Sequence, residues 1–354
     1  MRIPDLACRV LGTCAAIATA AGCEPQTPIG TPWAAPQMQA NRPVLGEANQ
    51  SRSNSSLDLT ANTNLYVANA GSSTITVYSR GSTKLLRTIS HGVNNPWALA
   101  FDTSSNLYDA NNDGNTVTVY APGKTSLLRT ISQGVSGPQA LVFDGSANLY
   151  VANLNNTVTV YAKGALKPLR KISKGILGPE ALAIGRSGYL YVANDFGSTV
   201  TEYPPGGTSP ALTISKGING PYALAFDGSA NLYVANTGNN TVTVYARGKT
   251  APLRTISQGV SRPDALCLDG SGYLYVANVA NNTVTVYPPG QSTLLRTVAK
   301  GISQPDALAI GSLGYLYVAN GANNTVTEYG PGGTYVVRTF SKGVNFPHAL
   351  AFGP

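Results

Sequence analysis

The chain has 354 residues and a net charge of +8 at pH 7, with 11% charged and 43% hydrophobic residues. So few charges exclude a coiled coil or a helical bundle, and so many apolar residues exclude a disordered chain. The length allows a single large all-β domain that buries a sizeable core.

The first 22 residues have the pattern of an export signal. Arg2 and Arg9 flank a short n-region, and an apolar, Ala-rich run follows from residue 10 to residue 21. This run is too short to span a bilayer as a permanent helix, and it ends in the small residues that a signal peptidase needs. We therefore expect residues 1–22 to be a signal peptide and the mature protein to be extracytoplasmic.

The end of this segment, Ala20-Ala21-Gly22-Cys23, resembles the bacterial lipobox. The resemblance implies that Cys23 is lipidated and holds the protein at the cell envelope. The lipobox prefers Leu where this chain has Ala20, and ordinary cleavage near Ala20 would instead give a secreted protein. Residues 23–56 are rich in Pro, Ser and Gln without any periodicity, so we expect a flexible tether there.

Residues 57–354 contain one unit repeated seven times. The string Leu-Tyr-Val-Ala-Asn, once with Asp for Val, recurs every 41 or 42 residues, starting at Leu65, Leu107, Leu149, Leu190, Leu232, Leu274 and Leu316. Each unit also holds a Thr-Val-Thr-Val-Tyr-like string, a Leu-Arg-Thr-Ile-like string and Pro-x-Ala-Leu. These four strings have strand character, and Asp-Gly-Ser or Asn-Asn-Thr turns separate them. Four strands in about 42 residues indicate one blade of a β-propeller.

The segment from Pro221 to Asn236 resembles the NHL repeat, and Leu-Tyr-Val-Ala-Asn followed by Asn-Thr-Val-Thr-Val resembles the YVTN repeat. The resemblance covers residues 57–354. It implies an all-β, seven-bladed β-propeller of four-stranded antiparallel blades. It implies little about function, because propellers support many activities.

The two ends of the repeat region indicate how the ring closes. The last Pro-x-Ala-Leu string begins at Pro347 and has no unit after it, whereas the strand at Leu65 has no good strand before it. We therefore expect the C-terminal strand, residues 349–352, to pair with the strand at Leu65 and close the ring. Leu57-Asp58-Leu59 is a weaker candidate for the same place.

The second residue of Pro-x-Ala-Leu differs between units while its neighbours repeat. We call these seven positions the x residues: Trp97, Gln139, Glu180, Tyr222, Asp264, Asp306 and His348. The first strand of a propeller blade lines the central channel, so the x residues should converge at the channel mouth. A concave opening with polar, acidic and aromatic groups is a candidate ligand site. The alternative is a solvated ring of loop-edge residues without a function.

Asp264, Asp306 and His348 belong to three successive units and are candidate ligands for a divalent cation. Oxygen ligands favour Ca²⁺ or Mg²⁺, and the imidazole admits Zn²⁺. The NHL-like propellers include metal-dependent lactonases and lyases. That resemblance implies His348 as general acid or base, with Glu180, Asp264 and Asp306 holding the metal.

The rest of the sequence favours binding over catalysis. The chain has two histidines and lacks Gly-x-Ser-x-Gly, His-Glu-x-x-His and Cys-x-x-Cys motifs. We therefore expect a monomeric, lipid-anchored scaffold that binds a protein, a glycan or a small ligand, and the metal-dependent lactonase or lyase is the alternative. A structural envelope protein is a third reading. Nucleic acid is not an expected partner, because the positive charge is dispersed over the repeats of an exported protein.

Two single residues break the repeat. Asp109 stands where the other six units have Val, so it either faces a polar partner or marks a locally frayed blade. Cys267 replaces an Ala of its strand and is expected to be a small buried core residue.

Overall fold

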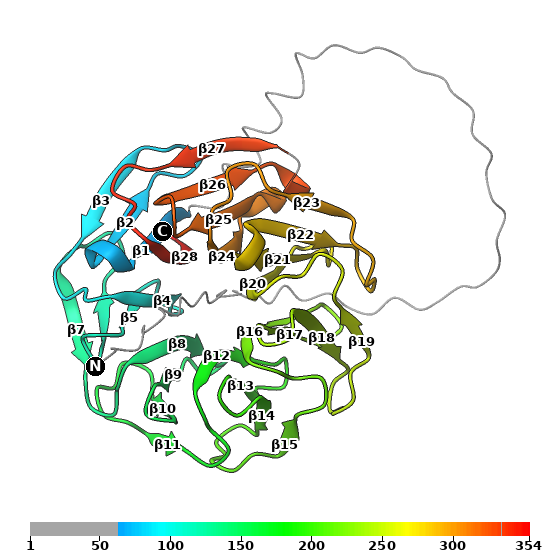
Figure 1. Cartoon of the computed structure of the whole chain (residues 1–354). Helices are drawn as coiled ribbons and strands as arrows, with labels where there is room; N and C mark the ends of the chain where they lie inside the picture. Colours follow the sequence, from blue (N-terminus) through cyan, green and yellow to red (C-terminus); the bar gives the residue numbers. More distant parts are fainter. Residues whose placement is uncertain (1–62, 334) are drawn as a thin grey trace, which may run out of the picture. The chain divides into compact units, whose positions relative to one another are not determined.

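The computed structural model describes residues 63–333 and 335–354. The predicted signal peptide, the lipidation site Cys23, the tether and the candidate strand Leu57-Asp58-Leu59 lie outside the described residues. Within the described part, seven four-stranded antiparallel sheets form a ring (Figure 1). This confirms the predicted seven-bladed all-β propeller.

Each blade is one sheet, and its strands run from the channel outwards in the order given. Blade 1 is β28 (Pro347–Gly353), β1 (Asn64–Asn69), β2 (Thr74–Tyr78) and β3 (Leu85–Ile89). Blade 2 is β4 (Pro96–Phe101), β5 (Leu107–Asn111), β6 (Thr116–Tyr120) and β7 (Leu127–Ile131). Blade 3 is β8 (Pro138–Phe143), β9 (Leu149–Asn153), β10 (Thr157–Tyr161) and β11 (Arg170–Ile172).

The remaining four blades repeat this order without interruption. Blade 4 is β12 (Pro179–Ile184), β13 (Leu190–Asn194), β14 (Thr199–Tyr203) and β15 (Leu212–Ile214). Blade 5 is β16 (Pro221–Phe226), β17 (Leu232–Asn236), β18 (Thr241–Tyr245) and β19 (Arg254–Ile256). Blade 6 is β20 (Pro263–Leu268), β21 (Leu274–Asn278), β22 (Thr283–Tyr287) and β23 (Arg296–Val298). Blade 7 is β24 (Pro305–Ile310), β25 (Leu316–Asn320), β26 (Thr325–Tyr329) and β27 (Val336–Phe340).

Short 3-10 turns are the helical segments of the described residues: η1 (Ala70–Ser72), η2 (Val279–Asn281), η3 (Ser312–Gly314) and η4 (Pro331–Gly333). No helix of the described chain is long and apolar enough to cross a membrane.

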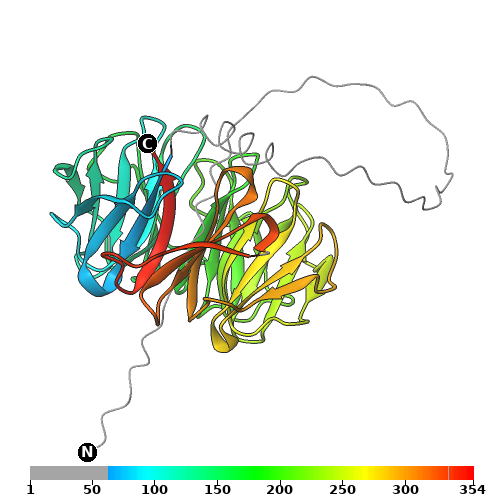
Figure 2. The ribbon, with the colours of Figure 1, turned by 90° about the horizontal axis from the view of Figure 1, so that it is seen from above.

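The C-terminal strand closes the ring, as predicted. Strand β28 pairs with β1, with Phe352 opposite Leu65 and Leu350 opposite Val67 (Figures 1 and 2). The Tyr66 hydroxyl donates a hydrogen bond of 2.6 Å to the carbonyl of the last residue, Pro354. Blade 1 therefore joins the two ends of the propeller in one sheet, and β1 has no unpaired edge.

A buried asparagine ends the second strand of every blade, and none of the seven has exposed surface: Asn69, Asn111, Asn153, Asn194, Asn236, Asn278 and Asn320. Its side-chain oxygen accepts the backbone N–H of the residue 17 positions earlier, at 2.7–3.2 Å, with Asn345 as the donor to Asn69 in blade 1. Its amide nitrogen donates to the carbonyl two residues earlier. The amide thus satisfies buried backbone groups that would otherwise destabilise the fold.

A second repeated hydrogen bond links each blade to the next. The residue before the third strand is Asn in five blades and Ser in two, and it has a positive φ in all seven. Its side-chain oxygen accepts the N–H of the residue 22 positions later, just before the inner strand of the next blade, at 2.7–3.3 Å. Because the last bond joins Asn324 to Phe346, the chain of links runs round the whole ring.

The tyrosines of the two repeated strings make hydrogen bonds that recur from blade to blade. The Tyr that ends the third strand donates to a carbonyl in the loop that leads into the blade, at 2.6–2.8 Å in all seven blades. The Tyr of the second strand accepts from the Arg of the outermost strand in four blades, at 2.5–2.9 Å. The sequence places these arginines on the outer strand but does not reveal that they bind a tyrosine of the same blade.

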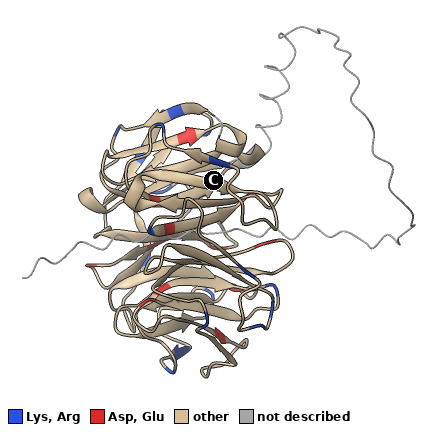
Figure 3. Cartoon of the chain, turned by 45° about the vertical axis from the view of Figure 1, so that its right-hand side comes forward, with Lys and Arg blue, Asp and Glu red and all other residues tan. Residues whose placement is uncertain are grey.

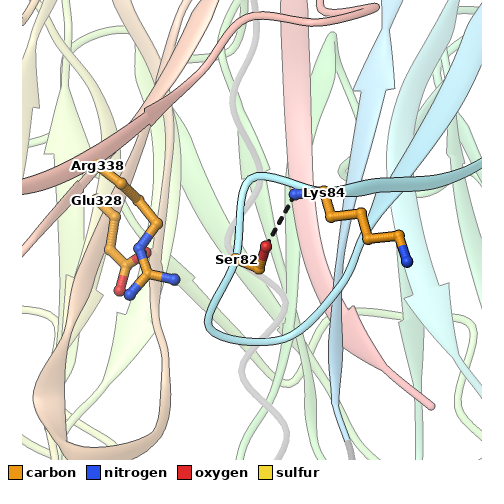
Figure 4. A network of polar contacts seen from close by, with 4 residues as sticks. All are labelled: Ser82, Lys84, Glu328 and Arg338. Atoms are coloured by element: carbon orange, nitrogen blue, oxygen red, sulfur yellow. Dashed lines mark hydrogen bonds and ion pairs between the residues drawn. The ribbon is translucent and has the colours of Figure 1, made fainter.

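The charged residues are spread over the blades and gather on no single face in the view of Figure 3. In blade 7 the outer Arg338 pairs with the buried Glu328 at 3.0 Å, and these two residues lie opposite each other in the strand register (Figure 4). Figure 4 also shows the β-hairpin of blade 1, in which the Lys84 N–H donates to the Ser82 hydroxyl at 3.1 Å.

Asp109 is completely buried in an intact blade. Strand β5 keeps full register with both neighbours, so the blade is not frayed. The Thr118 hydroxyl donates to one carboxyl oxygen at 3.3 Å, while the other oxygen has no hydrogen-bond partner in the described residues. Burial raises the pKa of Asp109 to about 8. The residue is therefore a carboxylic acid at pH 7.

Deleting residues 346–354 should destabilise the whole propeller. The deletion removes β28, and burial of Leu350 and Phe352 contributes about 1.5–3 kcal/mol each. Leu224→Ala, at the same repeat position in β16, is the control, because a single Leu→Ala cavity costs about 2–5 kcal/mol. In circular dichroism melts the deletion should lower the melting temperature far more than Leu224→Ala. A drop no larger than that of the control would contradict closure by β28.

Asp109→Val should stabilise the protein, and increasingly so as pH rises. The native pKa of about 8 lies above the value of about 3.9 in an unfolded chain, so Asp109 favours folding most below pH 4. That contribution is lost as pH rises towards 8. Urea unfolding at pH 7 should show a variant more stable by at least about 2 kcal/mol, the usual cost of a poorly satisfied buried polar group. A difference that is constant or shrinks between pH 4.5 and 8 would contradict the buried acid.

Candidate functional site

The x residues occupy a bulge at the start of each inner strand. In blade 7, for example, Pro305 pairs with Asn320 and Ala307 with Ala319, so Asp306 has no partner in the second strand. The same shift recurs in all seven blades. A bulge turns its extra residue out of the regular ladder. The side chain at x is therefore available to a site at this end of the channel.

The residue before each proline is in the left-handed region, with φ from 49° to 62°. Three blades have glycine there: Gly137, Gly178 and Gly220. The other four are consecutive round the ring and have larger residues: Arg262, Gln304, Phe346 and Asn95. This conformation is strained for a side chain other than Gly, and such strain clusters at functional sites.

Six of the seven x residues are buried: Gln139, Glu180, Tyr222, Asp264, Asp306 and His348. Trp97 is half-buried. The predicted ring is therefore not a set of solvated loop-edge residues. Neighbouring members interact, since the charges of Asp264 and Glu180 both raise the pKa of Tyr222, which is raised mainly by burial.

Trp97 and His348 form a stacked pair between neighbouring blades. Their ring centroids are 4.8 Å apart with an interplanar angle of 14°. Phe346 lies against the same imidazole at 6.2 Å. The indole N–H of Trp97 donates to the Asn95 side chain at 3.1 Å, which fixes the orientation of the ring. One arc of the mouth is thus aromatic.

Asp264 and Asp306 form the acidic part of the mouth, on the adjacent inner strands β20 and β24. None of their four carboxyl oxygens makes a hydrogen bond within the described residues. Burial is the main cause of their raised pKa values, and the charge of Asp264 contributes to a pKa of about 9 for Asp306. Gln304 and Arg262 lower the pKa of Asp306 only in part. Asp306 is therefore protonated at neutral pH.

Gly321, in the turn after β25, leaves the space that the Asp306 carboxyl fills. A Cβ at this position would collide with Oδ2 of Asp306. On another inner strand, Gln139 donates to the Gly137 carbonyl at 3.3 Å, while its side-chain oxygen is buried and has no partner in the described residues. The side chains of Asp264, Asp306 and Gln139 thus have buried oxygen atoms that accept no hydrogen bond from the described residues.

Asp264, Asp306 and His348, the predicted metal ligands, belong to three successive inner strands, β20, β24 and β28. In the described residues, no group of three or more His, Cys, Asp or Glu side chains is arranged to hold a metal ion.

Two surface features were not predicted from the sequence. Leu154, Leu177 and Phe196 are 46–61% exposed, and Leu154 and Phe196 pack over Gly137 and Gly178. In the sequence, the only indication of these exposed apolar residues is that the turn position of Leu154 varies between units.

At the other end of the channel, a groove of about 660 Å³ lies between blades 5 and 6. Its carboxyls, Asp227 and Asp269, are engaged by their own turns.

Comparison with known proteins shows the fold alone. No family model matches the sequence, and no curated protein does. A protein of unknown function from Desulfotomaculum acetoxidans is similar with a TM-score of 0.70 and 15% identity, over 83% of this chain and 99% of that one. A Bacteroides fragilis protein described as a "putative 6-phosphogluconolactonase" gives 0.69 and 18%, over 83% and 99%. The computationally designed Ika8 gives 0.64 and 19%, over 83% and 89%. Assignment to the NHL or YVTN repeats stays a prediction.

Asp264→Asn should lower the pKa of Asp306. The variant removes a neighbouring charge that raises this pKa, while the burial that dominates the shift remains. Carbon-13 NMR titration of the aspartate carboxyls should give about 9 for Asp306 in the native protein and a lower value in the variant. Asp113→Asn, at an exposed position in a turn of blade 2, is the control and should change nothing. An identical Asp306 titration in both variants would show that the two carboxyls are not coupled.

Proposed function

We propose that this protein is a binding scaffold, exported and anchored to the membrane through Cys23, whose ligand is a protein, a glycan or a small molecule held at the x-residue end of the channel. One observation carries the proposal. The x residues differ from blade to blade whereas the residues around them repeat, and the carboxyl oxygens of two of them, Asp264 and Asp306, are buried without a hydrogen bond in the described chain.

The energetic argument supports a ligand site. A buried polar group without a hydrogen bond costs about 1–3 kcal/mol, and a structural position would avoid that cost by carrying the same apolar residue in each repeat. Functional sites are where such costs are retained, because a ligand supplies the missing partners. The neighbouring strained backbone at Arg262, Gln304 and Phe346 supports the same location.

The proposed cellular location, partners and oligomeric state rest on features outside the x residues. The lipobox-like segment supports a membrane anchor at the cell envelope, and secretion is the outcome if ordinary cleavage occurs near Ala20. Dispersed charge supports a scaffold that does not bind nucleic acid, and we propose a monomer because the ring is closed by its own C-terminal strand.

A metal-dependent lactonase or lyase is the second candidate, with Ca²⁺, Mg²⁺ or Zn²⁺ as the cation. It is supported by the acidic pair beside His348 and by the fold shared with the Bacteroides fragilis protein. In this candidate Glu180, Asp264 and Asp306 would hold the metal and His348 would move the proton. Since the described residues form no group of three such ligands, no catalytic step follows from their geometry.

A thermal-shift panel on the full-length protein tests the proposal. The panel contains N-acetylglucosamine, ethanolamine, spermidine, 6-phosphogluconolactone, CaCl₂, MgCl₂ and ZnCl₂. At least one compound should raise the melting temperature of the native protein, and Trp97→Ala/His348→Ala should abolish that rise. Ser271→Ala, in an exposed turn at the other end of the channel, is the matched control and should keep it.

The same panel separates the two candidates. Binding without turnover of the lactone supports the scaffold. A stabilising metal together with lactone hydrolysis that is lost in Asp306→Asn would favour the enzyme. A response that is equal in the double variant and in the native protein would contradict a site at the x residues.

A further inference from the structure

The turn between the two outer strands of each blade carries either a basic residue or a proline at its second position. Blades 1, 3 and 5 have Arg80, Lys163 and Arg247 there, and the other four have proline, with Pro122 in blade 2 and Pro289 in blade 6. The turn has the same form in blades 2, 5 and 6, with a hydrogen bond between its first and fourth residues and a glycine of φ 69–73° at its third. The basic side chain and proline therefore replace each other on the same backbone.

In blade 5 the basic side chain reaches the neighbouring blade. The Arg247 guanidinium donates a hydrogen bond of 2.7 Å to the hydroxyl of Ser187, which lies in the turn between β12 and β13 of blade 4. Burial raises the pKa of Tyr191 on β13, and the charge of Arg247 lowers it in part, so the guanidinium lies near this tyrosine as well. The structure thus shows a guanidinium bound between the end turns of two adjacent blades.

The corresponding place between blades 5 and 6 is the groove of about 660 Å³. Ser229 of blade 5 corresponds to Ser187 of blade 4, since each lies three residues before the leucine that begins the second strand. Tyr233 corresponds to Tyr191 in the same way. Both Ser229 and Tyr233 line the groove, and Pro289 lines it from blade 6. Because proline has no basic group, this groove has the hydroxyl and the tyrosine of the blade 4 site without the arginine.

The groove is more acidic than the site that Arg247 occupies. Asp227 and Asp269 line it, whereas blade 4 has Gly185 at the position of Asp227. Asp269 accepts three hydrogen bonds in the described residues, two from backbone N–H groups of its own turn and one from the Tyr275 hydroxyl. An ionised carboxylate has about four acceptor positions, so Asp269 retains one for a ligand.

The single cation among the described residues that line the groove is held within its own blade. Arg254 donates to the Tyr233 hydroxyl at 2.7 Å, and its guanidinium carbon is 5.6 Å from the centroid of that ring. The Tyr233 hydroxyl donates in turn to Asp227 at 3.4 Å. Two carboxylates and one guanidinium leave the groove with one negative charge in excess, which favours a second cation.

We propose that the groove between blades 5 and 6 binds an arginine side chain of a partner protein, with its guanidinium on the Ser229 hydroxyl and the Asp269 carboxylate. A guanidinium has five donors in a rigid planar fork, so one side chain binds a carboxylate and a hydroxyl together. The groove lies at the opposite end of the channel from the x residues. The inference therefore goes beyond the proposed function and does not depend on it.

The test is isothermal titration calorimetry of the full-length protein, at low salt, with an acetylated and amidated Gly-Arg-Gly peptide. The matched neutral probe has citrulline in place of arginine, which keeps the length and the planar shape and removes the charge. The arginine peptide should bind at least about tenfold more tightly than the citrulline peptide, because hydrogen bonds of charged groups are the stronger ones. Ser229→Ala should weaken binding of the arginine peptide about tenfold.

Pro289→Arg should block the groove with a side chain of the protein itself. The variant gives blade 6 the residue that blade 5 has, so the new side chain should bind Ser229 as Arg247 binds Ser187. Binding of the arginine peptide should then be lost. Pro122→Arg, the same substitution in the same turn of blade 2, is the matched control and should keep the affinity. Circular dichroism melts establish that both variants are folded.

Four outcomes overturn the inference: equal binding of the citrulline peptide, arginine-peptide binding that Pro289→Arg leaves intact, loss of binding in Pro122→Arg, and no binding at all. If Pro289→Arg does not fold, Ser229→Ala decides, and an unchanged affinity in that variant contradicts the site. Trp97→Ala/His348→Ala should keep the arginine peptide bound. A loss in that double variant would assign the peptide to the x residues and refute the groove, whereas failure of the groove alone leaves the proposed function standing.

Discussion

The hydrogen bond between the asparagine at the end of the second strand and the backbone 17 residues earlier is the interaction on which the rest of the structure depends. It fixes the loop that carries the chain from the outer edge of one blade to the start of an inner strand. The bulge, the left-handed residue before the proline and the x side chain all follow within three residues of that bond. In blade 1 the same bond joins Asn345 to Asn69, so it also holds the two ends of the ring together. The same hydrogen bond therefore stabilises the fold and positions the candidate site.

Three buried aspartates with raised pKa values, Asp109, Asp264 and Asp306, lie in different surroundings. Asp109 lies inside a sheet, where Thr118 and Asn111 partly satisfy it and Val in the other units shows that no acid is required. Asp264 and Asp306 lie at a bulge at the channel end, beside each other and without hydrogen bonds in the described chain. All three have raised pKa values because of desolvation, yet only the second pair lies on the inner strands, at the end of the channel. The location of a perturbed acid, not the size of its shift, indicates its role.

The repeat itself made the fold predictable from the sequence. Six copies of Leu-Tyr-Val-Ala-Asn and one Leu-Tyr-Asp-Ala-Asn set the number of blades, and the unmatched strand at Pro347 predicted the closure. The x residues were also identified in advance, because a variable position in an invariant frame is visible without a structure. The sequence could not give the burial of Asp306 or the stacking of His348 on Trp97, since both depend on the radius of the ring and on side chains from different blades. The bonds between Arg and Tyr within a blade were missed because a surface charge and a buried partner give no joint sequence signal.

The geometry of the bulge explains why the x residues can differ while their neighbours cannot. Each neighbouring residue pairs with another strand, packs in the core or makes a side-chain hydrogen bond that repeats in every blade, so a substitution there would disturb a whole blade. An x side chain has no partner in the second strand, and replacing it leaves the regular hydrogen bonds of its sheet in place. Substitutions are therefore least destabilising at the x positions, which lie at the same end of the channel in every blade. At the position two residues before x, a left-handed residue other than glycine occurs in four consecutive blades, those that carry Asp264, Asp306, His348 and Trp97, which concentrates this backbone strain on one arc of the ring.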